Sequence, residues 1–474
     1  MPQKETRYQQ VALELGHQIE QGVYQPGEKL PGVRRLARQF GVSVNTTLHA
    51  LEQLEGEGRL TARPRAGFYV KAATTPIREP RSTETQGHPQ AVTGQELVLR
   101  LAWAASRPGI AQLGTAVPHP SFLPVEAIEQ AHGAARRRGG AGLQTYEFPP
   151  GHFELRRHIA RRMMDAGCPV DPDEVVITSG CQEAIMLALD AVTEPGDIVA
   201  IESPAFYGLL QGIEAQGLQA LEIPGDPETG ISLEALQLAV EQWPIKAVAA
   251  VTNFSNPLGG TIPADRKKRL VRLLAERGAV LIEDDIYGEL GYEGERPTAA
   301  KAYDEQGSVI YCSSFSKTVA PGLRIGWAVP GRNLDLLNFG KFATNQAAPS
   351  YPQRALAHFL AEGQLERYLR GIRGRYQTHV ARAIEAIRRR FPAEVRVSQP
   401  RGGFVIWVEL PEDVDALQLH ETALGQGVSI APGPIFSPSQ KFRNCLRLNC
   451  AQPWEDILEP ALERIGALLR SGAS

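Results

Sequence analysis

A lysine with hydroxyl and guanidinium neighbours is the most informative feature of this 474-residue sequence. Lys317 follows an apolar run, with Ser314 and Ser316 just before it and Arg324 one short segment after it. Hydroxyls and a guanidinium grouped near one lysine can hold a phosphate dianion, while the amine forms a Schiff base with an aldehyde. A lysine in that role needs cationic neighbours or desolvation to favour its neutral form, and Arg324 supplies the former.

Three other segments offer complementary chemistry. Asp284 and Tyr287 lie at the end of the apolar run AVLIED, where an aspartate can pair with a protonated pyridine nitrogen. Asn256 precedes Pro-Leu-Gly-Gly, a loop suited to donating a hydrogen bond to a phenolic oxygen. Cys181 and Gln182 begin a helix directly after the run VVIT, and backbone N–H groups at such a helix start bind phosphate.

The elements that must position these residues alternate along the chain. Apolar, β-branched runs bounded by Gly and Pro are separated by helical patterns, which predicts a mostly parallel sheet covered on both faces. The runs are 175–178, 197–202, 246–252, 279–284 and 308–314. After about residue 340, helical patterns and the strand-like runs 402–410 and 444–451 predict a smaller α/β domain.

These segments, in this order, resemble fold-type I pyridoxal-phosphate enzymes of the aspartate aminotransferase class, over roughly residues 96–470. The resemblance implies that Lys317 forms the Schiff base with pyridoxal 5'-phosphate and that Asp284 pairs with the pyridine nitrogen. It places Asn256 and Tyr287 at the ring's O3′. Position by position, the resemblance also implies a phosphate site formed by Cys181, Gln182, Ser314, Ser316 and Arg324. Tyr146 would reach the phosphate in a neighbouring subunit. Phe206 would stack on the ring, and Arg447 would bind the α-carboxylate of a substrate.

Two of these residues have an ordinary structural alternative when each is considered alone. Phe206 is more often a core residue than a shelf for a cofactor. Arg447 is equally compatible with a buried structural ion pair. The five matching segments together favour the cofactor site.

The N-terminal residues 1–72 have a different pattern. Apolar stripes over residues 7–21, 33–40 and 44–54 predict three amphipathic helices, with Gly41 in the turn and Ser43 as the N-cap of the third. Residues 60–62 and 67–71 then predict a hairpin with a basic tip. A short helix, a tight turn and a second helix are typical of DNA-binding proteins, in which the last helix enters the major groove.

This segment resembles the winged helix of the GntR family, and the EQLEGEG ending of the third helix is especially like the MocR branch. The resemblance implies double-stranded DNA as a partner, contacted by Arg34, Ser43, Asn45, Thr46, Arg63, Arg65 and Gly67. Val44 departs from the family, which usually has an arginine there. Valine can pack on a thymine methyl but cannot donate to guanine, so the resemblance implies the fold of the head and not its operator sequence.

The composition agrees with a protein of several domains that includes a flexible connection. Residues 73–95 are rich in Thr, Pro, Gln and Gly and lack apolar periodicity, which predicts a flexible linker between the head and a body of residues 96–470. Within the body we expect a large domain at about 120–335 and a small domain at about 336–470. The small domain also includes the N-terminal segment of the body. Residues 1–75 carry a net charge of +3 and the remainder −6, as expected for a head that meets polyanions.

The remaining compositional signals exclude several classes of protein. The five cysteines form no C-x-x-C pair, so neither a metal site nor a disulfide framework is indicated, and we expect them to be buried small hydrophobes. No apolar run is long enough to span a bilayer and the first residues lack a secretory signal. We therefore expect a cytoplasmic protein.

A DNA-binding head joined to an aminotransferase-like body is the arrangement of the MocR regulators. The resemblance implies a homodimer, with each head crossed onto the partner subunit, that senses an amino acid, an amine or the cofactor itself. The alternative is an active class I/II aminotransferase with an accessory DNA-binding head. A third possibility, a scaffold that binds cofactor only for folding, is disfavoured by Arg447 and Asn256.

Overall fold

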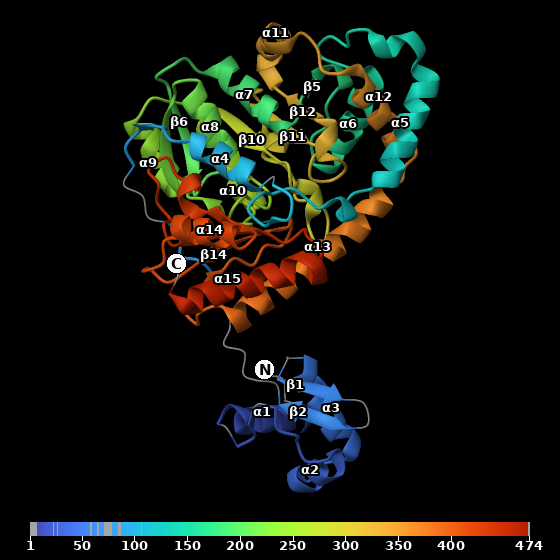
Figure 1. The fold of residues 1–474 in the computed structure, drawn as a ribbon, viewed down its shortest axis with the longest axis vertical. Helices are drawn as coiled ribbons and strands as arrows, with labels where there is room; N and C mark the ends of the chain where they lie inside the picture. The colour runs from blue at the N-terminus through green and yellow to red at the C-terminus, as the bar shows by residue number, and fades with distance from the viewer. Residues whose placement is uncertain are drawn as a thin grey trace. The chain divides into compact units, whose positions relative to one another are not determined.

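The computed structural model describes two compact units, residues 1–77 and 78–474. Within them the described residues are 7–21, 23–25, 27–56, 59–63, 66–70, 78–83, 87–105 and 107–472. Figure 1 shows the two units and their elements. Among the described residues, no helix has the length and apolar character needed to cross a membrane.

The first unit is a winged helix. Its elements are α1 Arg7–Glu20, α2 Val33–Phe40, α3 Val44–Gly56, β1 Leu60–Arg63 and β2 Gly67–Val70, and the two strands pair antiparallel. Leu15, Leu36 and Leu51 are fully buried in its core, on the predicted apolar stripes. The side chain of Ser43 accepts a hydrogen bond from the N–H of Thr46 at 3.1 Å, so the predicted N-cap is present.

The second unit contains a large twisted sheet with helices on both faces (Figure 1). The strand order is β3-β7-β6-β9-β10-β11-β12-β5, and β8 pairs with β7. The central pairs β7–β6, β6–β9, β9–β10 and β10–β11 are parallel, whereas β12 and β3 run antiparallel to their neighbours. The prediction of a mostly parallel sheet is confirmed. The strands are β3 Gln90–Ala91, β5 Val176–Thr178, β6 Ile198–Ser203, β7 Gln219–Asp226, β8 Gly230–Ile231, β9 Ile245–Val251, β10 Val280–Asp284, β11 Val309–Ser314 and β12 Gly326–Val329.

Side-chain alternation in β10 decides which residues face which layer of helices. Val280 and Ile282 pack in the cluster that includes α7 (Cys181–Val192) and α8 (Tyr207–Ala215). Leu281 packs on the other face, with α9 (Leu233–Gln242) and α10 (Ala264–Glu276). Because successive side chains of a strand point to opposite faces, Asp284 faces α7 and Glu283 faces α10.

The smaller sheet has the order β13-β14-β17-β16, with β13 Arg396–Val397, β14 Val405–Glu409, β16 Ala431–Pro432 and β17 Cys445–Asn449. A separate parallel pair joins β4 Ala111–Gln112 to β15 Val428–Ser429, so a segment that precedes most strands of the large sheet pairs with the C-terminal part of the chain. The remaining helices of this unit are α4 Glu96–Ala105, α5 Val125–Gly139, α6 Phe153–Asp165, α11 Leu334–Asn345, α12 Ser350–Ala361, α13 Leu365–Arg390, α14 Ala416–Gly425 and α15 Glu459–Ser471.

The prediction of a flexible linker at residues 73–95 is wrong for much of its described part. Ser82 donates to Asp226 at 2.9 Å and Thr83 donates to the carbonyl of Ser203 at 2.8 Å. Residues 90–91 form β3, which pairs with the edge strand β7. Backbone and hydroxyl hydrogen bonds at a sheet edge need no apolar periodicity, which is why composition alone suggested a mobile segment. Residues 73–77 and 84–86 of the predicted linker lie outside the described part of the chain.

Candidate functional site

Lys317 lies in the turn that follows β11, at the carboxyl end of a central strand. Its Nζ donates a hydrogen bond to the carbonyl of Ala116 at 2.5 Å. Burial, and then the charge of Arg447, lower the pKa of Lys317 to about 8, whereas Asp284 opposes the shift. The amine is therefore far easier to deprotonate than an ordinary lysine, as a nucleophilic amine requires.

The start of α7 provides an anion site beside this lysine. Gly180, the N-cap, has φ +89°, and a Cβ there would collide with the guanidinium of Arg324. Arg324 donates from Nη2 to the carbonyl of Ser179 at 2.9 Å, which fixes its guanidinium at this helix terminus. The side chains of Cys181 and Gln182 are engaged elsewhere, so these residues offer an anion their backbone N–H groups.

The hydroxyls before Lys317 complete the same end of the site. Ser314 and Ser316 are both buried, and the N–H of Ser316 donates to Oγ of Ser314 at 3.2 Å. Hydroxyl and guanidinium donors of residues 314–324 therefore meet helix N–H donors of residues 181–182, which lie far away in the sequence. Together they form a donor set suited to a phosphate dianion.

Asp284 lies deeper, under the helix α7. The thiol of Cys181 donates to its Oδ1 at 3.4 Å, and burial raises the pKa of Asp284 to about 6. A buried carboxylate held in this way is stabilised by any cation that approaches it, such as a protonated ring nitrogen. All five cysteines are buried and free, as the sequence predicted.

Phe206 and Glu202 line a small cavity together with Asp284. Phe206 is the N-cap of α8 and its ring lies 4.9 Å from that of Tyr207. Burial raises the pKa of Glu202 to about 8, and its Oε1 accepts from the N–H of Val251 at 3.2 Å. The sequence analysis missed Glu202. An acidic residue at the end of the apolar run 197–202 was the available signal, since Asp284 was selected on the same pattern.

Arg447 is fully buried on β17 and has no carboxylate partner among the described residues. Its Nη1 donates to Oδ1 of Asn256 at 3.1 Å and its Nη2 donates to the carbonyl of Gly114. Its guanidinium carbon lies 5.7 Å from the ring centre of Tyr207, another residue that sequence reasoning missed. The described residues thus provide no ion pair of the kind considered as an alternative, and a buried cation of this type can accept an anionic ligand.

The hydroxyl of Tyr287 is a second incompletely satisfied group. The side chain is fully buried, and its oxygen has no hydrogen-bond partner among the described residues. The charges of Arg447 and Asp284 both act on this hydroxyl. A buried hydroxyl without a partner costs about 1–3 kcal/mol, so a ligand atom that bonds to it recovers stability.

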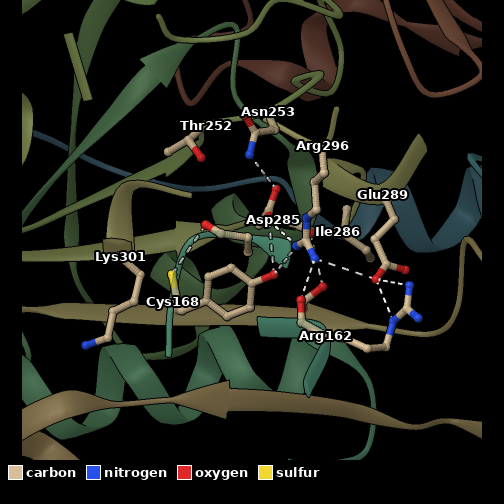
Figure 2. A network of polar contacts seen from close by, with 12 residues as sticks. Arg162, Cys168, Thr252, Asn253, Asp285, Ile286, Glu289, Arg296 and Lys301 are labelled. Carbon is tan, nitrogen blue, oxygen red and sulfur yellow. Dashed lines mark hydrogen bonds and ion pairs between the residues drawn. The ribbon is translucent and has the colours of Figure 1, made fainter. Parts of the chain in front are cut away.

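A buried polar network holds Asp285 and Glu289, on either side of Ile286, in place (Figure 2). Asp285 accepts from Arg296 at 2.7 Å, from Tyr311 at 3.0 Å and from Asn253 at 2.8 Å. Glu289 pairs with Arg162 of α6 and, at 3.6 Å, with Arg296. The network anchors Asp285, directly after Asp284, and Glu289, two residues after Tyr287. No pattern in the sequence indicated this network.

The remaining predicted residues are Tyr146 and the DNA-contacting residues of the head. Tyr146 is 69% exposed and stacks on Phe148 at 5.4 Å, so its predicted contact with a neighbouring subunit stays a prediction. On the head, the predicted DNA-contacting residues Arg34, Ser43, Asn45, Arg63 and Gly67 are exposed and Thr46 is half-buried, whereas Arg65 lies outside the described residues. Arg63 lies over the ring of Tyr69 at 4.3 Å.

The fold of the second unit is that of the aminotransferases, and the first unit is a winged helix. Comparison with known families matches residues 117–465 to aminotransferases of class I and II and residues 7–70 to bacterial regulatory proteins of the gntR family. The chain therefore belongs to the class I and II aminotransferase family and carries a GntR-type helix-turn-helix domain fused to that body.

Individual relatives have the same two parts or the body alone. The uncharacterized HTH-type transcriptional regulator YjiR of Escherichia coli K12 is 41% identical over 97% of this chain and 98% of its own length. The 2-aminoadipate transaminase of Thermus thermophilus is 34% identical over 81% of this chain and 95% of its length. The crystal structure of Pyrococcus horikoshii kynurenine aminotransferase, a complex with PMP, aligns with a TM-score of 0.74 at 30% identity, over 81% of this chain and 96% of that one.

The residues of the site fit pyridoxal phosphate. A primary amine with a lowered pKa, a donor set for a dianion and a buried carboxylate occupy one site, at Lys317, the α7 terminus and Asp284. The hydroxyl of Tyr287 and Nε of Arg447 are buried without protein partners among the described residues, as expected where a ligand supplies them. Pyridoxal phosphate is the cofactor of this family, and each of its polar groups has a complementary protein group here.

Proposed function

We propose that this protein is a pyridoxal-phosphate-dependent transcription regulator of the MocR type, acting in the cytoplasm as a homodimer. The observation that carries the proposal is the coexistence of two intact sites in one chain. The body retains Lys317 with its surrounding anion and carboxylate groups, and the head retains a capped third helix and its wing. HTH-type regulators related over nearly the whole chain support it.

In this proposal different residues of the chain bind different parts of the cofactor and of the effector. Lys317 holds the cofactor covalently, the α7 terminus and Arg324 hold its phosphate, and Asp284 keeps a proton on the ring nitrogen. The cofactor, when bound, supplies an electrophilic carbon that captures amino compounds. Arg447 orients an amino compound by its α-carboxylate, which makes an α-amino acid the effector best suited to the site.

Effector binding changes the DNA affinity of the heads only if it favours one conformation of the body over another. The segment that contains Gly114 and Ala116 contacts both Arg447 and Lys317, so it senses both the effector and the cofactor linkage. A change there alters the spacing of the two heads on DNA. The DNA contacts proposed are Arg34, Ser43, Asn45, Thr46, Arg63, Arg65 and Gly67.

An exposed aromatic surface supports the homodimer. Phe339 is 72% exposed, and Phe148 lies 6.0 Å from Phe342 and beside Tyr146. Exposed aromatic side chains grouped in this way are typical of protein interfaces. A second copy on this surface would bury Tyr146 close to the neighbouring cofactor, and two heads would read two half-sites, each crossed onto the partner subunit.

An active aminotransferase remains the second candidate, because the site lacks no residue type that transamination requires. The deciding experiment is a gel shift on the protein's own upstream DNA, with and without pyridoxal phosphate and candidate amino acids, alongside turnover with the same amino donors. Regulation predicts salt-dependent DNA binding that R34Q weakens and that an amino acid changes. Turnover at or above about 1 s⁻¹ without specific DNA binding would instead establish the enzyme.

A further inference from the structure

A basic cavity in the second unit is separate from the Lys317 site. It lies between α5, α6 and α12 and has a volume of about 310 Å³. That is within the size range of small-molecule sites. Its polar lining consists of Arg138, His152, His158, Arg354, His358 and one carboxylate, Glu154.

The carboxylates around the cavity are already neutralised. Glu147 accepts from Arg354 at 3.1 Å, and Glu154 accepts from Arg157 at 2.6 Å. Arg138 has no carboxylate partner among the described residues, and its Nη1 lies 3.3 Å from Nε2 of His358. One uncompensated guanidinium and three imidazoles therefore face the same space.

His158 gives the second, independent indication of a ligand. Its side chain lines the cavity, the residue is only 9% exposed, and its ring makes no hydrogen bond among the described residues. Because no described group bonds to this ring, its nitrogens are available to a ligand or to water in the cavity. It therefore lines the same cavity as the more exposed Arg138 and can donate a hydrogen bond there.

We propose that this cavity binds the phosphate group of a small molecule. Arg138 supplies the forked, permanently charged donor that phosphate prefers, and His158 and His358 supply imidazole N–H donors from two other helices. His152 ends the loop that begins at Tyr146 and donates to Glu147 at 3.4 Å, so a bound phosphate also contacts the base of that loop. The site is independent of the cofactor's own phosphate site at α7.

Binding is coupled to protonation because the imidazoles face an anion. Burial, and then the charges of Arg157 and Arg161, lower the pKa of His158, and burial also lowers that of His152. The other charged groups around the cavity are Arg138 on α5, Arg354 on α12, and Glu147 and Glu154. A bound phosphate dianion favours the protonated imidazoles, so the protein should take up protons, and comparison with His158→Gln separates this uptake from the protons that phosphate itself releases near pH 7.

The test is calorimetric titration of the cofactor-loaded protein with inorganic phosphate and, separately, with glycerol phosphate. We expect one site per chain, with a proton exchange that is measured by titrations in two buffers of different ionisation enthalpy. Arg138→Gln should weaken binding at least fivefold, and His158→Gln should reduce the proton uptake. Arg136→Gln, which removes the same charge from the same helix outside the cavity, should bind as the wild type does.

Each other outcome overturns the proposal. No saturable binding of either phosphate compound at millimolar concentration excludes a phosphate site. Equal weakening by Arg138→Gln and Arg136→Gln means that only the general charge of α5 attracts the anion. Because the cofactor site is filled throughout, and its loading is checked by visible absorbance, a negative result here leaves the proposed regulator function untouched.

Discussion

Nη1 of Arg447 donates to Oδ1 of Asn256 at 3.1 Å, joining a strand of the small sheet to a loop of the large one. The two residues are 191 positions apart. This bond links the group that would grip an effector carboxylate to the group that would touch the cofactor ring. Carboxylate binding can therefore alter the cofactor's surroundings through one hydrogen bond.

We expect Arg447→Lys to weaken binding of α-amino acids by about tenfold to a hundredfold, because charged hydrogen bonds contribute about 1.5–3 kcal/mol and lysine lacks the planar fork. The measurement is a spectral titration of the cofactor-loaded protein. The corresponding amine without a carboxylate is the control, and its affinity should not change. An equal loss for both ligands would show that Arg447 only supports the fold.

Tyr287→Phe should have different effects in the protein with cofactor and in the protein without it. In the cofactor-free protein the buried hydroxyl has no partner among the described residues, so its removal should leave the free energy of unfolding unchanged or raise it by about 1 kcal/mol. In the loaded protein the variant should lose the hydrogen bond to the ring, with lower cofactor affinity and a shifted visible band. A loss of stability that is equal with and without cofactor would contradict this role.

The rate of cofactor capture should follow the ionisation of Lys317. With a pKa of about 8, the neutral amine dominates above that pH, and its fraction falls tenfold for each pH unit below it. Growth of the visible band after mixing cofactor-free protein with pyridoxal phosphate should therefore level off above about pH 8. Free lysine methyl ester titrated in parallel corrects for ionisation of the aldehyde itself. Lys317→Ala should give no band, whereas the exposed Lys268→Ala should behave as the wild type.

Glu202→Gln should change stability in a pH-dependent way. The pKa of Glu202 is about 8 in the folded protein and ordinary in the unfolded chain, so the unfolded chain releases its proton first as pH rises. The wild type therefore loses stability between about pH 4.5 and 8, whereas glutamine does not titrate. Urea unfolding should show the variant gaining about 2–4 kcal/mol relative to the wild type between pH 5 and 8. A difference that does not vary with pH would refute the buried, neutral carboxyl.

Arg296→Gln tests the network in Figure 2. Removing this guanidinium leaves Asp285 buried without its ion-pair partner, and such losses cost about 3–5 kcal/mol. Cofactor affinity should fall as well, because the loop that carries Asp284 and Tyr287 loses its anchor. Arg272→Gln removes an arginine whose side chain is 80% exposed and should change stability by less than about 0.5 kcal/mol. An unchanged cofactor affinity in Arg296→Gln would show that the network stabilises the fold but does not position the cofactor site.

The sequence by itself determined the elements and their chemistry. Apolar runs predicted strands at β5, β6, β9, β10 and β11, and spacing around Lys317 predicted the amine and its serines. The N-cap at Ser43 was predicted as well, because a cap depends on neighbours three residues away. Such features follow from local periodicity, which is written into consecutive residues.

Only the tertiary structure decided which distant side chains meet. Sheet order and strand parity bring the thiol of Cys181 to Asp284, place Glu202 in the same cavity, and leave Arg447 without an acid among the described residues. The same long-range pairing fixed residues 90–91 as an edge strand where composition suggested a linker. Contacts between residues a hundred or more positions apart depend on how whole elements pack, and no local pattern encodes that.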